Sequence, residues 1–178
     1  MTSEQIGMLL SLAAMVVTVY SFQIKHKAPL MVAQSIGSIL FLVSYIFSGG
    51  GFAIYLNIIF LIRNTLFMFI DCSVGRLKYY VGGALLVSYV VTFIAYTAIA
   101  AEPWSVAAWY ILPLLAATFG TIGTMFSNVN VYRAWKYGDS ICWFSFNLHI
   151  GIGALGGIVG EILTFISLTV GIIRYRKK

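Results

Sequence analysis

The chain has 178 residues, of which 61% are hydrophobic and only 9% are charged, and its formal net charge is +6. A soluble domain usually carries about 25% charged residues, so this composition excludes a water-soluble globular domain and indicates a protein embedded in lipid. The positive charge does not indicate a nucleic-acid-binding protein, because almost all lysines and arginines fall in short predicted loops and in the C-terminal tail.

Seven stretches are long and apolar enough to cross a bilayer as helices, which takes about 20 residues, with about 17 tolerated. They are predicted at residues 5–24, 30–48, 52–70, 79–101, 107–127, 139–154 and 157–173. No basic segment precedes the first stretch, so we expect it to stay in the protein as an uncleaved helix. The fold class is therefore all-α, a polytopic helical bundle that forms one membrane domain over residues 1–178.

The connections between the predicted spans are short. A glycine turn from Gly49 to Gly51 joins the second and third spans, and a basic loop is predicted from Arg133 to Ser140. Residues 139–173 as a single helix would be about 50 Å long, well beyond a hydrocarbon core of about 30 Å. We therefore divide them at a second glycine turn, from Gly153 to Gly157.

Seven spans place nearly all the basic side chains on one side of the membrane. Of the eleven lysines and arginines only Arg63 lies elsewhere, and the others are Lys25, Lys27, Arg76, Lys78, Arg133, Lys136, Arg174, Arg176, Lys177 and Lys178. Because cytoplasmic loops carry an excess of basic residues, we predict a cytoplasmic C-terminus and an N-terminus outside.

Two segments of the chain repeat each other. Residues 37–57 and 141–161 align without a gap, which places Asn57 on Glu161 and Tyr45 on His149. We therefore predict two three-helix repeats, at 5–70 and 107–173, joined by a linker helix at 79–101. Since three helices reverse the chain, the fourth lets the second repeat start on the same side, and the repeats are parallel about an axis along the membrane normal.

Motifs in the third, sixth and seventh spans resemble those of a known family. They are Asn57-x5-Arg63-Asn64, Trp143…Asn147 and Gly156-Gly157-x3-Glu161…Ile172-Ile173-Arg174-Tyr175. On these residues the chain is similar to YgjV-type bacterial inner-membrane proteins, and its 3+1+3 arrangement looks like the wider class of SWEET, PQ-loop and PnuC transporters. The resemblance implies a multi-pass protein of the bacterial cytoplasmic (inner) membrane and, by analogy of fold alone, transport.

Two ionisable residues at membrane depth are the first candidates for a site. An ionisable group there costs about 2.5–3.5 kcal/mol, so Arg63 and Glu161 each invite a functional explanation. Arg63 could extend towards the cytoplasmic side, or it could point inward to pair with Glu161 or with an anionic group on a ligand. Glu161 could contact a solute, carry a proton, or cap the preceding glycine turn.

Amide and imidazole side chains complete the candidate set. Asn57 and Asn64 lie seven residues apart and share a stripe of the third span, where they could bind a solute or hold helices together. Asn147 follows Trp143 by four residues, whereas His149 lies about 200° from Asn147 around the helix, so only one of the two can face a narrow cavity. The alignment of the repeats leaves both choices open.

The sequence favours a transporter-like protein that binds a small polar solute between the repeats, through Asn57, Arg63, Asn64, Asn147, His149 and Glu161. A membrane protein that only packs or interacts is the competing class. We expect no enzyme, because no nucleophile and base are paired, and neither a cofactor nor a metal, because His149 and Glu161 alone would give two ligands. The expected partners are the lipid bilayer and the solute, without nucleic acid, and a homo-oligomer is compatible with the sequence.

Overall fold

The computed structural model describes residues 3–48, 51–70, 75–101, 103–150 and 155–176, and it confirms the all-α class. Seven long helices make up most of this part of the chain: α1 (Ser3–Ser21), α2 (Lys27–Ser48), α3 (Phe52–Phe69), α4 (Leu77–Ala100), α6 (Ile111–Thr124), α7 (Val129–Ile150) and α8 (Leu155–Tyr175). The short helix α5 (Trp104–Ala107) and the 3-10 turn η1 (Ala108–Tyr110) lead directly into α6.

Five helical stretches in the described residues are long and apolar enough to span a bilayer, at Lys27–Phe47, Phe52–Phe69, Leu77–Ala100, Trp104–Thr124 and Gly157–Tyr175. The apolar part of α1, Gln5–Ser21, is shorter. Their large apolar side chains point outward, as in Val16, Ile94 and Ile166, each more than half exposed. Apolar surfaces of this extent occur where a protein contacts a membrane or a partner, and the length of these helices favours the membrane.

One predicted boundary is wrong. The sixth span was placed at 139–154, after a loop from Arg133 to Ser140, but α7 begins ten residues earlier at Val129. Asn128 caps it, because its Oδ1 accepts a hydrogen bond of 2.8 Å from the backbone N–H of Asn130. The polar residues of the supposed loop are helical because their side chains face the interior of the bundle and find partners there.

The glycine turns fall only partly within the described residues. Gly51 directly precedes α3 and has φ +43°, a conformation that favours glycine, whereas residues 49 and 50 lie outside the description. Residues 153 and 154 also lie outside it, and Gly157 belongs to the first turns of α8.

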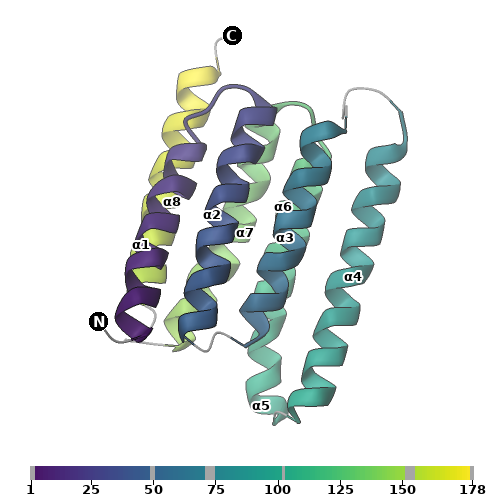
Figure 1. The fold of residues 1–178 in the computed structure, drawn as a ribbon. Coiled ribbons are helices and arrows are strands. Elements are labelled where there is room, and N and C mark those ends of the chain that lie inside the picture. The colour runs from purple at the N-terminus through teal and green to yellow at the C-terminus, as the bar shows by residue number, and fades with distance from the viewer. Residues whose placement is uncertain (1–2, 49–50, 71–74, 102, 151–154, 177–178) are drawn as a thin grey trace.

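The long helices are arranged in two layers, with α1, α2 and α3 in one and α8, α7 and α6 in the other (Figure 1). α1 packs on α8 and α3 packs on α6, so the layers meet at both sides of the bundle. α4 stands at the edge, where it contacts α3 and α6. The space between the layers is the interior of the protein.

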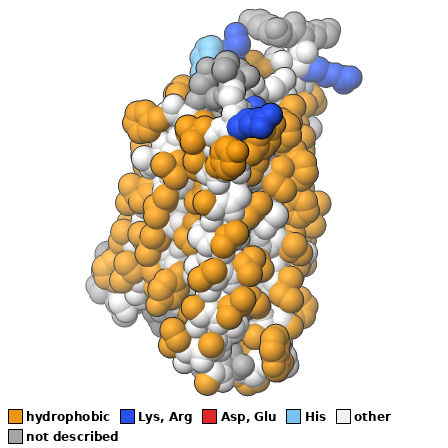
Figure 2. Space-filling model, turned by 90° about the vertical axis from the view of Figure 1, so that its right-hand side faces the viewer, with side chains coloured by type: hydrophobic (Ala, Val, Ile, Leu, Met, Phe, Trp, Pro, Cys, Tyr) orange, Lys and Arg blue, Asp and Glu red, His pale blue; other side chains and the backbone are white. Residues whose placement is uncertain are grey.

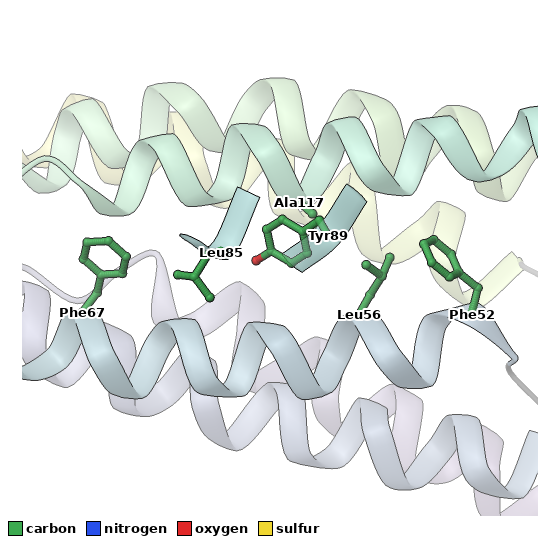
Figure 3. Packing of buried hydrophobic residues seen from close by; sticks show 6 residues of the cluster. All are labelled: Phe52, Leu56, Phe67, Leu85, Tyr89 and Ala117. Carbon is green, nitrogen blue, oxygen red and sulfur yellow. The ribbon is translucent and has the colours of Figure 1, made fainter. Parts of the chain in front are cut away.

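Two apolar clusters hold this arrangement. The first consists of Phe52, Leu56, Phe67, Leu85, Tyr89 and Ala117, which join α3, α4 and α6 (Figure 3). The second consists of Phe22, Leu30, Met31, Tyr132 and Leu168, which join the α1–α2 connection to α7 and α8. Polar side chains occupy the interior between these clusters.

The lysines and arginines of the described surface gather at one end of the bundle. We call this the basic end, and it comprises the end of α1, the start of α2, the end of α3, the start of α4, the connection between α6 and α7, and the end of α8 (Figure 1). Figure 2 shows the basic side chains at this end, above a face covered by hydrophobic groups. α1 begins at the opposite end, and α8 ends at the basic end.

Candidate functional site

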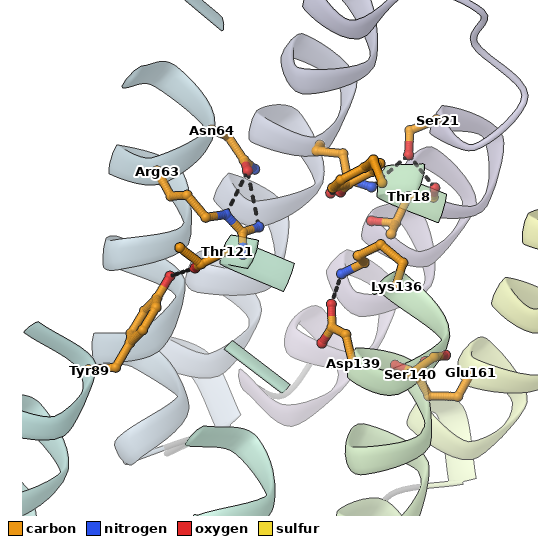
Figure 4. Close-up of polar contacts among 12 residues, drawn as sticks. Thr18, Ser21, Arg63, Asn64, Tyr89, Thr121, Lys136, Asp139, Ser140 and Glu161 are labelled. Atoms are coloured by element: carbon orange, nitrogen blue, oxygen red, sulfur yellow. Dashed lines mark hydrogen bonds and ion pairs between the residues drawn. The ribbon is translucent and has the colours of Figure 1, made fainter. Parts of the chain in front are cut away.

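Charged and polar side chains from both layers meet in the interior. We call this group the charged cluster: Arg63 and Asn64 of α3, Lys136, Asp139 and Ser140 of α7, and Glu161 of α8 (Figure 4). Its formal charges cancel, because two basic residues stand beside two acidic ones. Only three of its six members were among the residues expected from the sequence, namely Arg63, Asn64 and Glu161.

Arg63 points into the bundle and not towards solvent at the basic end. It is 3% exposed, and its guanidinium lies 4.9 Å from the ring centre of Phe60. Its Nε and Nη2 donate to Asn64 Oδ1 at 3.2 Å and 3.0 Å. Arginine has no acceptor, so this contact fixes the orientation of the Asn64 amide. The Nδ2 of Asn64 is buried without a hydrogen-bond partner in the described part of the chain.

Lys136 and Asp139 form an ion pair one turn apart on α7. Their side chains are 14% and 4% exposed, so the pair lies almost entirely inside the protein. The Oδ2 of Asp139 accepts a hydrogen bond from Lys136 Nζ, while its Oδ1 is buried and has no hydrogen-bond donor among the described residues. A carboxylate oxygen in this position retains an unused capacity to accept a hydrogen bond.

Gly120 of α6 allows the two layers to bring their charges together. A Cβ at this position would lie 2.7 Å from Arg63 Nη1 and 3.2 Å from Asp139 Oδ2, so both atoms face the same point. They therefore lie within about 6 Å of each other, yet the ion pair found among the described residues is that of Lys136 and Asp139. Because glycine has no side chain, a cation of one layer and an anion of the other can both approach α6 at this point.

Glu161 joins the cluster from α8, through α7. Its Oε2 accepts a hydrogen bond from Ser140 Oγ. Lys136 lies near enough to interact with it electrostatically, whereas no ion pair joins it to Arg63 within the described residues. Direct pairing of Arg63 with Glu161, one of the alternatives that the sequence left open, is not found among the described residues, where groups on α7 stand between the two side chains.

The remaining candidates lie apart from the charged cluster. Asn57 is buried, but its Nδ2 donates to the Ala53 carbonyl of its own helix at 2.9 Å.

Asn147 faces α8, where its amide nitrogen would lie 2.5 Å from a Cβ at Gly157. His149 is exposed and stacks on Trp109, with ring centres 3.6 Å apart and planes 10° from parallel. Of the two alternatives on α7, Asn147 faces a neighbouring helix of the bundle and His149 faces outward.

The spacing of polar and aromatic residues in the sequence could have predicted that Lys136 and Asp139 lie on the inner face of a helix. Tyr132, Lys136, Asp139, Trp143 and Asn147 follow one another at spacings of four, three, four and four, which is one face of a helix. The hydroxyl of Tyr132 donates to Gln34 Oε1 of α2 at 2.8 Å, so this face contacts the other layer at Tyr132. Reading hydropathy alone turned the first half of the stripe into a loop.

A second polar group, at the basic end, ties the layers through Arg133. This residue is 1% exposed, and it donates from Nε to the Phe22 carbonyl at 3.0 Å and from Nη2 to the Ile24 carbonyl at 2.8 Å. Its guanidinium lies 5.0 Å from the ring centre of Tyr175, at the end of α8. A cation on α7 thus binds the connection between α1 and α2.

Lys27 makes the corresponding contact in the reverse direction. From the start of α2 it donates to the Thr124 carbonyl at the end of α6, at 2.5 Å, and it lies 5.4 Å from the ring centre of Phe67 at the end of α3. Each layer therefore supplies one cation that binds backbone carbonyls of the other layer and contacts an aromatic ring of its own. The two contacts join the layers at the basic end.

Comparison with known proteins places the chain in a family. No match was found among curated proteins or among solved structures. A family model described as bacterial inner membrane protein, Imp-YgjV, matches residues 5–178, which is nearly the whole chain. Its description agrees with the apolar helices and the lipid-facing surface described above. The chain therefore belongs to the Imp-YgjV family and is an integral, multi-pass protein of the bacterial inner membrane.

Proposed function

We propose that this protein binds a small polar solute at the charged cluster and moves it across the inner membrane. The observation that carries the proposal is the meeting of four ionisable side chains between the two layers, of which Arg63 and Asp139 are buried and Lys136 and Glu161 are partly buried. Each such group costs about 2.5–3.5 kcal/mol at membrane depth, and helices can be held together by serine, threonine or asparagine at lower cost. A site with a function beyond packing accounts for the charges better.

The arrangement of the helices supports two parallel repeats. α1, α2 and α3 lie in that order in one layer, while α8, α7 and α6 lie opposite them, with α1 against α8 and α3 against α6. A twofold axis along the membrane normal would exchange α1 with α6 and α3 with α8, and it would leave α4 as the linker. This is the arrangement implied by the likeness to SWEET, PQ-loop and PnuC transporters, in which repeats move against each other.

The roles of the side chains follow from their positions. Arg63 and Asn64 of the first repeat and Asp139 of the second would hold the solute, while Glu161 would balance the charge or exchange a proton. Asn57 and Asn147 would contact the solute nearer the opposite end, and exposed His149 would lie at its entrance. No bond of the solute is made or broken in this scheme.

The orientation of the protein is part of the proposal. The basic end would face the cytoplasm, because basic connections are retained on that side of the membrane. A reporter enzyme active only in the cytoplasm, fused after Lys178, should then be active, and a periplasmic reporter at the same position should be silent. The opposite pattern would reverse the assignment and would require an even number of spans or an inverted insertion.

The binding of a solute is tested by thermal unfolding of the purified protein against a library of small polar metabolites. A solute present at 100 times its Kd should add about 2.7 kcal/mol to the stability of the native state. Glu161→Ala should reduce that shift and the uptake of the same solute by cells, and Asn57→Ala should weaken them less. If both variants lower stability while no solute stabilises the wild type or enters cells, the polar residues only hold helices together.

A further inference from the structure

In the charged cluster, an arginine of one layer and a carboxylate of the other lie close together without forming an ion pair. Arg63 Nη1 and Asp139 Oδ2 face each other across Gly120, too far apart for an ion pair, which needs about 4 Å, and within about 6 Å. Two hydrogen bonds that meet at one atom span about 5 Å. A polar group that accepts from Arg63 and donates to Asp139 can therefore bridge two atoms at this separation.

The other oxygen of the same carboxylate lacks a hydrogen-bond donor among the described residues. Asp139 is 3% exposed and its Oδ1 has no hydrogen-bond partner among the described residues, although its Oδ2 binds Lys136. A buried carboxylate oxygen without a donor is costly, so the structure leaves this position to a group that the chain itself does not supply.

The net charge of the cluster restricts what can bind. Arg63 and Lys136 are already balanced by Asp139 and Glu161, so an anion drawn to Arg63 would leave one negative charge uncompensated inside the membrane. A cation drawn to Asp139 would leave one positive charge uncompensated. A ligand without net charge avoids both costs.

We infer that the charged cluster selects a solute that is dipolar but has no net charge, with its acceptor end on Arg63 and its donor end on Asp139. The inference rests on the proposed function and specifies its substrate class. Two kinds of molecule offer this chemistry, namely a zwitterion with a carboxylate and an ammonium group, and a neutral molecule with a carboxamide or hydroxyl group. In this arrangement Arg63 binds the acceptor end of a dipolar solute and does not bind an anion as a separate ligand.

Four small probes of similar size test this inference on the purified full-length protein in detergent micelles. Acetamide is neutral, glycine is a zwitterion, acetate is an anion and acetamidinium is a cation, and saturation-transfer NMR reports the binding of each. Acetamide or glycine should bind about tenfold more tightly than either ion. A tenfold difference in affinity corresponds to about 1.4 kcal/mol, and an uncompensated charge in hydrocarbon costs more than this. Whichever of acetamide and glycine binds more tightly shows whether the solute is a neutral molecule or a zwitterion.

A variant that changes the net charge without touching the bridge gives the matched control. Glu161→Gln can keep the contact with Ser140 but leaves the cluster with one excess positive charge, so acetate should now bind more tightly than acetamide or glycine. Asp139→Asn/Lys136→Met removes the bridging carboxylate while keeping the charges balanced, and it should weaken all four probes. A wild type that prefers acetate or acetamidinium, or an order of affinities unchanged by Glu161→Gln, would overturn the inference.

The outcome also separates this inference from the proposed function. If the metabolite library yields a solute that is taken up but carries a net charge, transport stands and the neutral substrate class is wrong. If none of the four probes binds and the library yields no solute, both fail. If the probes fail but a net-neutral metabolite binds and loses affinity in Asp139→Asn/Lys136→Met, the inference holds.

Discussion

Arg133→Gln is expected to lower the free energy of unfolding by about 2–4 kcal/mol. The wild-type guanidinium donates to the Phe22 and Ile24 carbonyls, and to Asn130 Oδ1 at 2.6 Å. Hydrogen bonds to a charged group contribute about 1.5–3 kcal/mol each, and the shorter glutamine cannot replace the set. The carbonyls of the α1–α2 connection would then be left without their donors, and the layers would separate first at the basic end.

Chemical or thermal unfolding of the purified variants in micelles measures this effect. Arg174→Gln is the matched control, because Arg174 is an arginine of the same end but is exposed, and its loss should change stability by no more than about 0.5 kcal/mol. Equal midpoints for the two variants would show that the contacts of Arg133 do not hold the layers together.

Asp139→Asn is expected to be the most damaging single change within the charged cluster. It removes the partner of Lys136 and leaves that cation buried, which costs about 3–5 kcal/mol when one half of a buried pair is lost. It also leaves the cluster with one excess positive charge. The fraction of protein that survives extraction and purification should therefore fall sharply.

The double variant Asp139→Asn/Lys136→Met should recover most of that loss. Replacing a buried ion pair by uncharged groups of similar volume is often neutral, and here Arg63 and Glu161 would still balance each other. A double-mutant cycle measures the coupling between the two positions, and removal of both charges should be less harmful than removal of the carboxylate alone. Additive losses would show that Lys136 does not depend on Asp139.

Hydropathy and helix length predicted most of the helices. Six of the seven predicted spans correspond to the described helices α1, α2, α3, α4, α6 with its preceding turns, and α8, with ends that differ by a few residues. Long apolar stretches can be recognised because lipid imposes the same requirement on every residue that faces it.

The first half of α7 was mispredicted because it faces the protein and not the lipid. Charged side chains near a connection resemble a loop when only hydropathy is considered, yet Lys136 and Asp139 are stable inside because they neutralise each other. The sequence also could not predict the hydrogen-bond partner of each polar side chain. Arg63 donates to Asn64 and lies against Gly120, and the second contact depends on how closely α6 approaches α3.

The central claim is that a solute binds between Arg63 and Asp139, beside Gly120. Gly120→Ala tests it, because the added methyl group would lie 2.7 Å from Arg63 Nη1 and 3.2 Å from Asp139 Oδ2 and would displace the guanidinium from its position beside Asp139. Gly83→Ala is the control, since a Cβ at that glycine of α4 meets no atom within 4 Å.

The deciding measurement is the Kd of the solute that most stabilises the wild type, determined for both variants by titration in micelles. The account predicts that Gly120→Ala weakens binding at least about tenfold, a change of roughly 1.4 kcal/mol, while Gly83→Ala leaves it unchanged. Equal affinity of the wild type and Gly120→Ala for that solute would contradict the assignment of the site to the charged cluster.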